Sequence, residues 1–445
     1  MSTSNILLQG SGDRIAASRV MSEGELSKVP IVSVGACDSP SVDAAGRWRT
    51  SHPGTIFTGK LIHADSQALM WDESLESGTM ATSGPTAGKP HIDFTSTANT
   101  AGKRTRQTFR HFNYQPGKSQ QILIVGVLEL ASGVKTGCER RIGAFTDSNG
   151  IFFESDAGTI GVTVRTNDSG SPVDTTVTQS NWNLDKMNGE GDADNPSGLI
   201  LDPTKTQIFV FDFLWLSADR IRFGVKISGT IYYVHEFNIG ANVGQIPWAS
   251  TPNLPLRYQI ITTTSSGVCS MRCVCGAVIS EGGTQDIGIT RYKSTAGAAV
   301  TCTTDNTVYA IVGIRLKSTH LGAEIRILKT ELQIQTGSDS GEWILLFNPT
   351  VAGSFTYSDL TNSAVQTAIG ATANTVTGGT EITGGFLQST SVGNGSGSVS
   401  GAIDSALLLG SKIDGTVDTI VLCFRTNAAT ASPEVEGSLT WKEIS

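Results

Sequence analysis

The chain contains 445 residues, of which 38% are hydrophobic and only 16% charged, and its formal net charge is −8 at pH 7. It is rich in Gly (50), Ser (47) and Thr (52). This composition argues against a helical protein, because Thr favours strands and Gly favours tight turns. The acidic balance argues against binding to the phosphate backbone of a nucleic acid.

Residues 1–105 contain many turn formers and few strand patterns. Such a segment has too little apolar surface to form a core of its own. We therefore expect an irregular, extended N-terminal arm that lies along another surface and serves in assembly. The sequence starts without a recognisable signal peptide and has no run of 18 apolar residues, so we expect cytoplasmic production and no membrane span.

Residues 106–292 show a regular strand pattern, which predicts a β-sandwich of the jelly-roll or concanavalin-like size. Both faces of the segment Gln207–Leu216 are apolar, which indicates a central strand covered on both sides. The next segment alternates apolar and basic residues, as a half-buried strand does. The predicted strands are 120–130, 151–154, 160–165, 207–216, 220–227, 230–238, 256–264 and 268–279.

Residues 293–445 repeat this pattern with different sequence and predict a second, smaller β-sandwich. Residues 403–409 could form one short helix. The expected fold class is therefore all-β, with two β-sandwich domains preceded by the arm. The predicted strands of this part are 308–316, 324–334, 342–347, 385–388, 416–425 and 435–444.

Seven cysteines are spread along the chain, an odd and sparse set that does not indicate a disulfide framework. Cys269, Cys273 and Cys275 would share one face of a strand, so a thiolate metal site is conceivable. No fourth ligand follows at a recognised spacing. We favour three small buried hydrophobic side chains.

Two groups of residues are weak candidates for binding. Glu190, Asp192 and Asp194 alternate in a Gly-rich loop whose oxygens could hold calcium, although the spacing differs from the EF-hand signature and a solvated acidic loop is the simpler interpretation. Trp248 and Tyr258 flank a Pro-rich loop and could stack on sugar rings. The alternative for Trp248 is that it closes the end of the sandwich core.

The sequence shows no recognised catalytic pattern. A Gly-x-Ser-x-Gly elbow is absent and the six histidines are isolated from one another. Asp212 and Glu236 are only positional candidates for the two carboxylates of a glycoside hydrolase. We therefore expect no enzymatic activity, no catalytic residues and no cofactor.

Several segments resemble a poorly characterised family of virion structural proteins from tailed phages and some large DNA viruses. The resemblance covers residues 105–292 and, more loosely, Gly437–Glu443, whereas the first 100 residues carry none of it. It implies a role in the particle but no site residues. The segments that carry it are Phe109–Leu123, Arg141–Glu154, Gln179–Lys186, Leu201–Phe209, Tyr233–Asn238 and Ser250–Tyr258.

The resemblance and the composition together lead us to expect a non-enzymatic protein on the exterior of a phage particle. It would be a capsid decoration protein or a tail fibre component, assembled in the host cytoplasm as a homo-oligomer, most simply a trimer, with other virion proteins as partners. It could also bind a host surface glycan. The alternatives are a glycan-binding lectin-like module and a virion-associated polysaccharide hydrolase.

Overall fold

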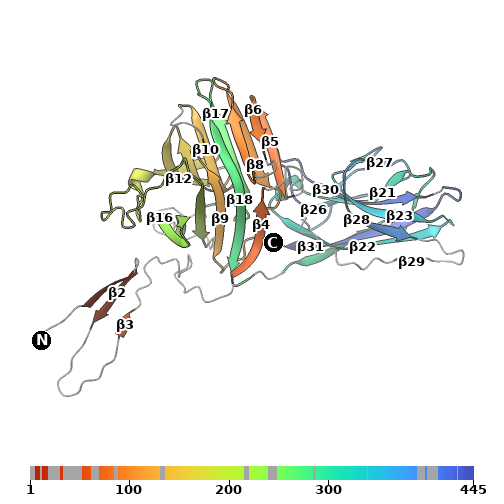
Figure 1. Cartoon of the computed structure of the whole chain (residues 1–445). Helices are drawn as coiled ribbons and strands as arrows, with labels where there is room; N and C mark the ends of the chain where they lie inside the picture. Colours follow the sequence, from red (N-terminus) through yellow and green to blue (C-terminus); the bar gives the residue numbers. More distant parts are fainter. Residues whose placement is uncertain are drawn as a thin grey trace, which may run out of the picture.

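The computed structural model shows an all-β protein (Figure 1). Apart from strands, the described residues form two short 3-10 helices, η1 (Gln179–Asn181) and η2 (Ser318–His320). No helix in this part of the chain is long and apolar enough to cross a membrane. The structure describes residues 53–61, 70–84, 89–130, 136–214, 220–238, 248–283, 287–337, 339–387, 409–427 and 429–444, and the backbone of 6–10, 13–18, 31–33 and 396–397.

The first sandwich consists of two antiparallel sheets. The seven-stranded sheet has the order β13 (Val173–Thr178), β12 (Thr159–Thr166), β11 (Gly150–Asp156), β10 (Cys138–Phe145), β17 (Leu256–Thr262), β8 (Gly102–Thr108), β5 (Trp71–Ser77). The eight-stranded sheet has the order β16 (Thr230–Asn238), β15 (Arg220–Ile227), β14 (Gln207–Phe213), β9 (Gln120–Val127), β18 (Ser270–Glu281), β7 (Ile92–Ser96), β6 (Met80–Ser83), and β4 (Pro53–Lys60) also pairs with β18.

Aromatic side chains join these two sheets. Phe153 of β11 contacts Phe209 and Phe211 of β14 and Phe223 of β15, with ring centroids 4.8–5.7 Å apart. All four rings are fully buried. The alternating pattern of β14 therefore directs its phenylalanines into the core, and the prediction of a central strand is confirmed, because β14 lies between β15 and β9. Trp215, at the end of the predicted strand, lies outside the described residues.

The first sandwich begins earlier in the chain than the predicted boundary at residue 105. Strands β4 to β8 come from residues 53–108 and pair within the two sheets of this sandwich. Phe57, Trp71 and Phe94 from this stretch are buried in its core. This corrects the expectation of an irregular arm for residues 53–105, since short strands with few apolar residues are stabilised by longer neighbours that follow much later in the sequence. Nearer the N-terminus, β1 (Ile6–Gly10), β2 (Asp13–Ser18) and β3 (Ile31–Ser33) form a separate antiparallel sheet.

The second sandwich is smaller, as expected, and lies beside the first (Figure 1). One sheet has the order β19 (Ile289–Ser294), β31 (Glu434–Ile444), β22 (Glu324–Thr336), β29 (Ser396–Gly397), with β20 (Val300–Thr301) on β31. The other has the order β25 (Ser358–Asp359), β26 (Val365–Ile369), β21 (Val308–Leu316), β30 (Thr419–Thr426), β23 (Gly341–Phe347), β28 (Thr380–Leu387). Two short strands, β24 (Thr350–Val351) and β27 (Val376–Thr377), pair as a separate two-stranded sheet. Tyr309, Phe424 and Trp441 are buried between them. The helix predicted at 403–409 falls outside the described residues except for Leu409, which bridges to Ile325.

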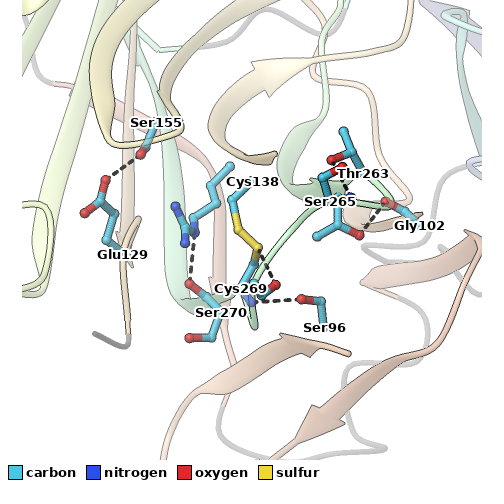
Figure 2. The surroundings of a disulfide bond; sticks show 12 residues. Ser96, Gly102, Glu129, Cys138, Ser155, Thr263, Ser265, Cys269 and Ser270 are labelled. Atoms are coloured by element: carbon cyan, nitrogen blue, oxygen red, sulfur yellow. Dashed lines mark hydrogen bonds between the residues drawn. A yellow bond between two sulfur atoms is a disulfide. The ribbon is translucent and has the colours of Figure 1, made fainter. Parts of the chain in front are cut away.

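One disulfide links the two sheets of the first sandwich, between Cys138 at the start of β10 and Cys269 just before β18 (Figure 2). This corrects the interpretation of Cys269 as a free buried thiol. The partners are 131 residues apart in sequence, so no spacing rule could indicate the pair. Cys273 is buried and free, as predicted, whereas Cys275 is free but only partly buried.

Candidate functional site

The acidic loop predicted as a weak calcium site directs its carboxylates to its own chain. Asp192 Oδ1 accepts the backbone N–H groups of Asp194 and Asn195, each at 2.9 Å. Lys186 Nζ donates to Asp194 at 2.6 Å. Glu190, Asp192 and Asp194 are all exposed. Within the described residues, no group of three or more His, Cys, Asp or Glu side chains has a metal-binding arrangement. The loop is therefore closed by local turns.

Trp248 and Tyr258, the predicted glycan contacts, lie in the core, and this prediction is wrong. Trp248 is 2% exposed and its ring meets that of Phe213 edge-on. Tyr258 is fully buried, and its hydroxyl donates to the carbonyls of Val125 and Cys275. The alternative interpretation of Trp248, that it closes the end of the sandwich core, agrees with this packing. Neither ring offers a face to a ligand.

The two positional carboxylates of the hydrolase alternative are both paired with arginines. Asp212 is fully buried and accepts from Arg222 at 2.6 Å, while Glu236 accepts from Arg220 at 3.1 Å. In the register of β14, β15 and β16, Arg222 stands opposite both carboxylates. Arg222 therefore stands between Asp212 and Glu236, and no open space is left there for the bond of a substrate.

The two sandwiches meet through hydrogen bonds, an ion pair and an aromatic contact. Arg110 lies between β8 and β9, and Glu324 begins β22, so their ion pair joins the first sandwich to the second. The Glu324 carboxylate is nearly buried, which makes this a specific contact and not a surface pair. The contacts are Arg110 Nη2 to Glu324 Oε1 (2.9 Å), Asn253 Nδ2 to the Gly322 carbonyl (3.0 Å), the Ile413 N–H to Asp72 Oδ2 (3.0 Å) and Phe109 edge-on to Phe347.

A polar cleft of about 430 Å³ lies at this junction. The first sandwich supplies the loop between β10 and β11, the loop before β17 and the ends of β8 and β17, and the second supplies η2 and residues 411–415. We call it the junction cleft. Its lining residues are Gln107, His111, Thr146, Asp147, Ser148, Asn149, Asn167, Ser250, Thr251, Asn253, Arg257, Ser318, Thr319, Leu321, Gly322, Ser411, Lys412, Ile413 and Gly415. Hydroxyl and amide side chains dominate this surface.

The carboxylate of Asp147 is held by two cations. Its Oδ1 accepts from Arg257 Nη1 at 2.7 Å and from Lys103 Nζ at 3.2 Å. Partial burial alone would raise the pKa of Asp147, but the charges and hydrogen bonds of Arg257 and Lys103 outweigh it, so the pKa lies below its usual value. Asp147 is therefore ionised at neutral pH, and its half-exposed side chain can accept further hydrogen bonds.

The side chains around Asp147 are held in place by their neighbours. Arg257 Nε donates to Gln107 at 2.7 Å, and its guanidinium lies 5.3 Å from the ring centre of Phe145. Asn149 and Ser250 exchange two hydrogen bonds, of 2.7 and 3.0 Å. The wall of the junction cleft that the first sandwich supplies is therefore rigid before any ligand arrives.

His111 adds a neutral imidazole to the junction cleft. Its pKa is lowered to about 4, mainly by burial and also by the positive charge of Arg257, against a hydrogen bond to the backbone of Phe109. Asp147 is the one carboxylate among the described lining residues. The junction cleft thus offers hydroxyl, amide and imidazole groups around a single ion-paired aspartate, which suits the binding of a hydroxyl-rich ligand.

The junction cleft could not be recognised from the sequence. The available signal was the polar stretch Thr146–Asn149 between two apolar strands and the similar stretch Ser250–Asn253. Each reads as an ordinary turn. Only the pairing of β10 with β11 and β17 brings them together.

No protein-family profile matches the chain, and no curated protein matches it. Solved structures with a similar fold include the endo-1,3-β-glucanase of Streptomyces sioyaensis (11% identity, 51% of this chain and 96% of that one, TM-score 0.33). Others are a Bacillus licheniformis β-glucanase (11%, 52% and 99%, 0.32) and the CBM2 module of the evolved Dit protein of Lactobacillus casei BL23 phage J-1 (10%, 53% and 98%, 0.31). At these identities and TM-scores the likeness is limited to the fold of about half of this chain.

Proposed function

We propose that this chain is a non-enzymatic structural protein on the exterior of a tailed phage particle and that its junction cleft binds a neutral saccharide. The main support for a binding activity is the junction cleft itself, which both sandwiches form and which hydroxyl and amide groups line. The particle role is supported by the low charge, the Ser, Thr and Gly content and the resemblance of residues 105–292 to virion proteins.

A neutral ligand follows from the charges of the junction cleft. Asp147 is compensated by Arg257 and Lys103, and His111 is uncharged at neutral pH. Lys412 is exposed at the rim, where its charge acts on neighbouring Asp414. A carboxylated sugar would find no buried, uncompensated cation among the described lining groups. Sugar hydroxyls, by contrast, could donate to Asp147 and exchange hydrogen bonds with the surrounding Ser, Thr and Asn side chains.

Binding without cleavage is favoured by the single carboxylate. Glycoside hydrolysis commonly uses two carboxyl groups, one as acid and one as base or nucleophile. In the described lining, Asp147 has no second carboxylate opposite it, and its ion pairs oppose the protonation that a general acid requires. The alternative of a polysaccharide hydrolase therefore has less support than a binding function.

The binding activity can be tested by blocking the junction cleft. We expect Ser318→Trp, on exposed η2, to weaken binding of neutral oligosaccharides at least tenfold in calorimetric titrations. Ser354→Trp, an equally exposed serine of the second sandwich outside the lining, is the matched control and should bind like the parent protein. Equal binding by both variants would exclude the junction cleft, and a preference for acidic oligosaccharides would contradict the proposed ligand class.

The particle role needs a separate experiment. Quantitative mass spectrometry of purified phage particles should find the chain in stoichiometric amounts, and light scattering of the isolated protein should give the mass of a homo-oligomer, most simply a trimer. Hundreds of copies would indicate capsid decoration, and a few dozen or fewer a tail fibre component. Absence of the chain from purified particles would exclude the role.

A further inference from the structure

A short hairpin of the second sandwich connects the junction cleft to the first sandwich. It comprises residues 409–418 and is closed by a bridge between Ser411 and Val417 and by the hydrogen bond from the Lys412 N–H to the Thr416 carbonyl (2.8 Å). We call it the 409–418 hairpin. Its residues 411–413 and 415 line the junction cleft, so a movement of the hairpin changes the shape of the cleft.

The 409–418 hairpin contacts the first sandwich at two points. The N–H of Ile413 donates to Asp72 Oδ2 of β5 at 3.0 Å. Gly410 lies so close to the backbone of Phe109 that a Cβ atom at this position would be 2.9 Å from the Phe109 carbonyl oxygen. The hairpin therefore depends on close contact with a different domain.

At the base of the hairpin, Asp418 has one carboxylate oxygen without a partner. The residue is 1% exposed, and its Oδ1 accepts from Asn348 Nδ2 at 2.7 Å. Its Oδ2 is buried and has no hydrogen-bond partner among the described residues. A buried charged oxygen without a hydrogen bond is costly, and the cost disappears when the carboxyl group takes up a proton.

The charged groups around Asp418 come from both sandwiches. Asp72 of β5 and Asp414 of the hairpin are negative, and Lys412 of the hairpin is positive. Together these effects raise the pKa of Asp418 to about 6. Burial is the main cause, and Asp72 and Asp414 act in the same direction, while Asn348 and Lys412 oppose them. Asp418 therefore changes its charge in a mildly acidic range.

We propose that the 409–418 hairpin is a proton-controlled latch between the two sandwiches. When Asp418 is neutral, the hairpin stays docked on Asp72. When Asp418 is ionised, its unpaired oxygen and the repulsion from Asp72 favour release of the hairpin. A role of the latch in controlling access of a ligand depends on the proposed saccharide site. The opening of the latch itself can be measured without any ligand.

The direction of the effect follows from linkage. Docking raises the pKa of Asp418 from an ordinary value near 3.8, so the docked state loses stability as the pH rises from about 4 to about 6 and remains less stable above that range. With these two values, the open hairpin should be about tenfold more populated at pH 7.5 than at pH 5.

Hydrogen exchange of the full chain tests the proposal. After correction for the intrinsic rate, the amide of Ile413, whose partner Asp72 belongs to the first sandwich, should be about tenfold less protected at pH 7.5 than at pH 5. Asp418→Asn, which imitates the neutral acid, should abolish this difference and remain protected at both pH values. Asp168→Asn, an exposed aspartate outside the junction, should behave like the parent protein.

Three results would overturn the latch. The first is an unchanged pH dependence in Asp418→Asn. The second is a titration midpoint of Asp418 below 4.5 in the parent protein, which carbon-13 NMR of labelled aspartate can measure without any variant. The third is restoration of protection at pH 7.5 by millimolar calcium, which would assign the unpaired oxygen to a cation. A latch that opens as expected in a protein that binds no saccharide would refute the proposed function alone.

Discussion

At the scale of single residues, arginines on the outer face of the seven-stranded sheet stack on an aromatic ring and also pair with carboxylates. Arg141 and Arg165 lie 5.0 and 5.3 Å from the ring centre of Phe152. The same arginines form ion pairs, Arg165 with Asp174 at 2.7 Å. Partial burial opposes the charged form of Arg165, but its bonds to Asp174 outweigh this and raise its pKa. Both arginines on this face are therefore paired with carboxylates as well as stacked on Phe152.

Phe211 provides a test of the core at the same scale. We expect Phe211→Ala to lower the free energy of unfolding by about 3–5 kcal/mol, because it leaves a cavity among Phe153, Phe223 and their neighbours. Phe386→Ala, which removes a 77% exposed ring, is the control and should change stability by less than about 0.5 kcal/mol. Chemical denaturation gives both values. A silent Phe211→Ala would contradict the two-layer core.

At the scale of secondary structure, the strands with a clear apolar pattern could be predicted and those without one could not. The bounds of β15 and β16 agree with the predicted 220–227 and 230–238 because apolar and polar residues alternate there. β10 was missed because it carries three charged residues, of which Arg140 is fully buried. β13 was missed because it is an edge strand rich in Thr, with two valines as its apolar residues.

The site was harder to predict than the strands. The junction cleft draws its residues from segments more than 300 positions apart, from Gln107 to Gly415, and each segment is polar in the way that ordinary loops are polar. Trp248 and Tyr258 were poor guides for the opposite reason. Their large rings suggested stacking on sugars, but burial of large apolar rings also stabilises the core of the sandwich, and both rings lie there.

The disulfide between β10 and the segment before β18 allows a prediction at this scale. Replacing Cys138 and Cys269 together with Ser should lower the free energy of unfolding by about 2–4 kcal/mol, because the bond constrains a long loop of the unfolded chain. Dithiothreitol should weaken the parent protein by a similar amount and leave the double variant unchanged. Cys275→Ser, a half-buried free thiol, is the control. Equal stability of the parent with and without reductant would show that the bond does not form in solution.

At the scale of the whole molecule, the two sandwiches do not divide where the composition of the chain changes. The apolar pattern becomes regular near residue 106, but the first sandwich starts at β4, because β8 pairs with β17 and β4 and β7 pair with β18. Composition reports local strand propensity, whereas the domain boundary depends on which strands pair across the chain.

Two truncated proteins test this boundary. Residues 53–283 should unfold cooperatively, because they contain all strands of both sheets of the first sandwich. Residues 106–283 should fail to do so, since they lack most of β8 and all of β4 and β7, so that β17 keeps only β10 and β18 keeps only β9 as a neighbour, and they also lack the buried Phe57, Trp71 and Phe94. Circular dichroism melting curves distinguish the two. A cooperative transition in the shorter protein would restore residue 105 as the boundary.

The position of β31 affects how the protein is made. This strand, Glu434–Ile444, lies between β19 and β22, so the earliest strand of the second sandwich pairs with its latest. While a ribosome adds residues at about 5–20 per second, β19 must wait roughly 8–30 s for its neighbour. During that interval the nascent sandwich exposes an open sheet edge and an incomplete core. The second half of the molecule therefore completes its folding only after residue 444 has emerged. A chaperone, or a second nascent chain on the same messenger RNA, that binds this edge during the interval would determine how much protein reaches the native state.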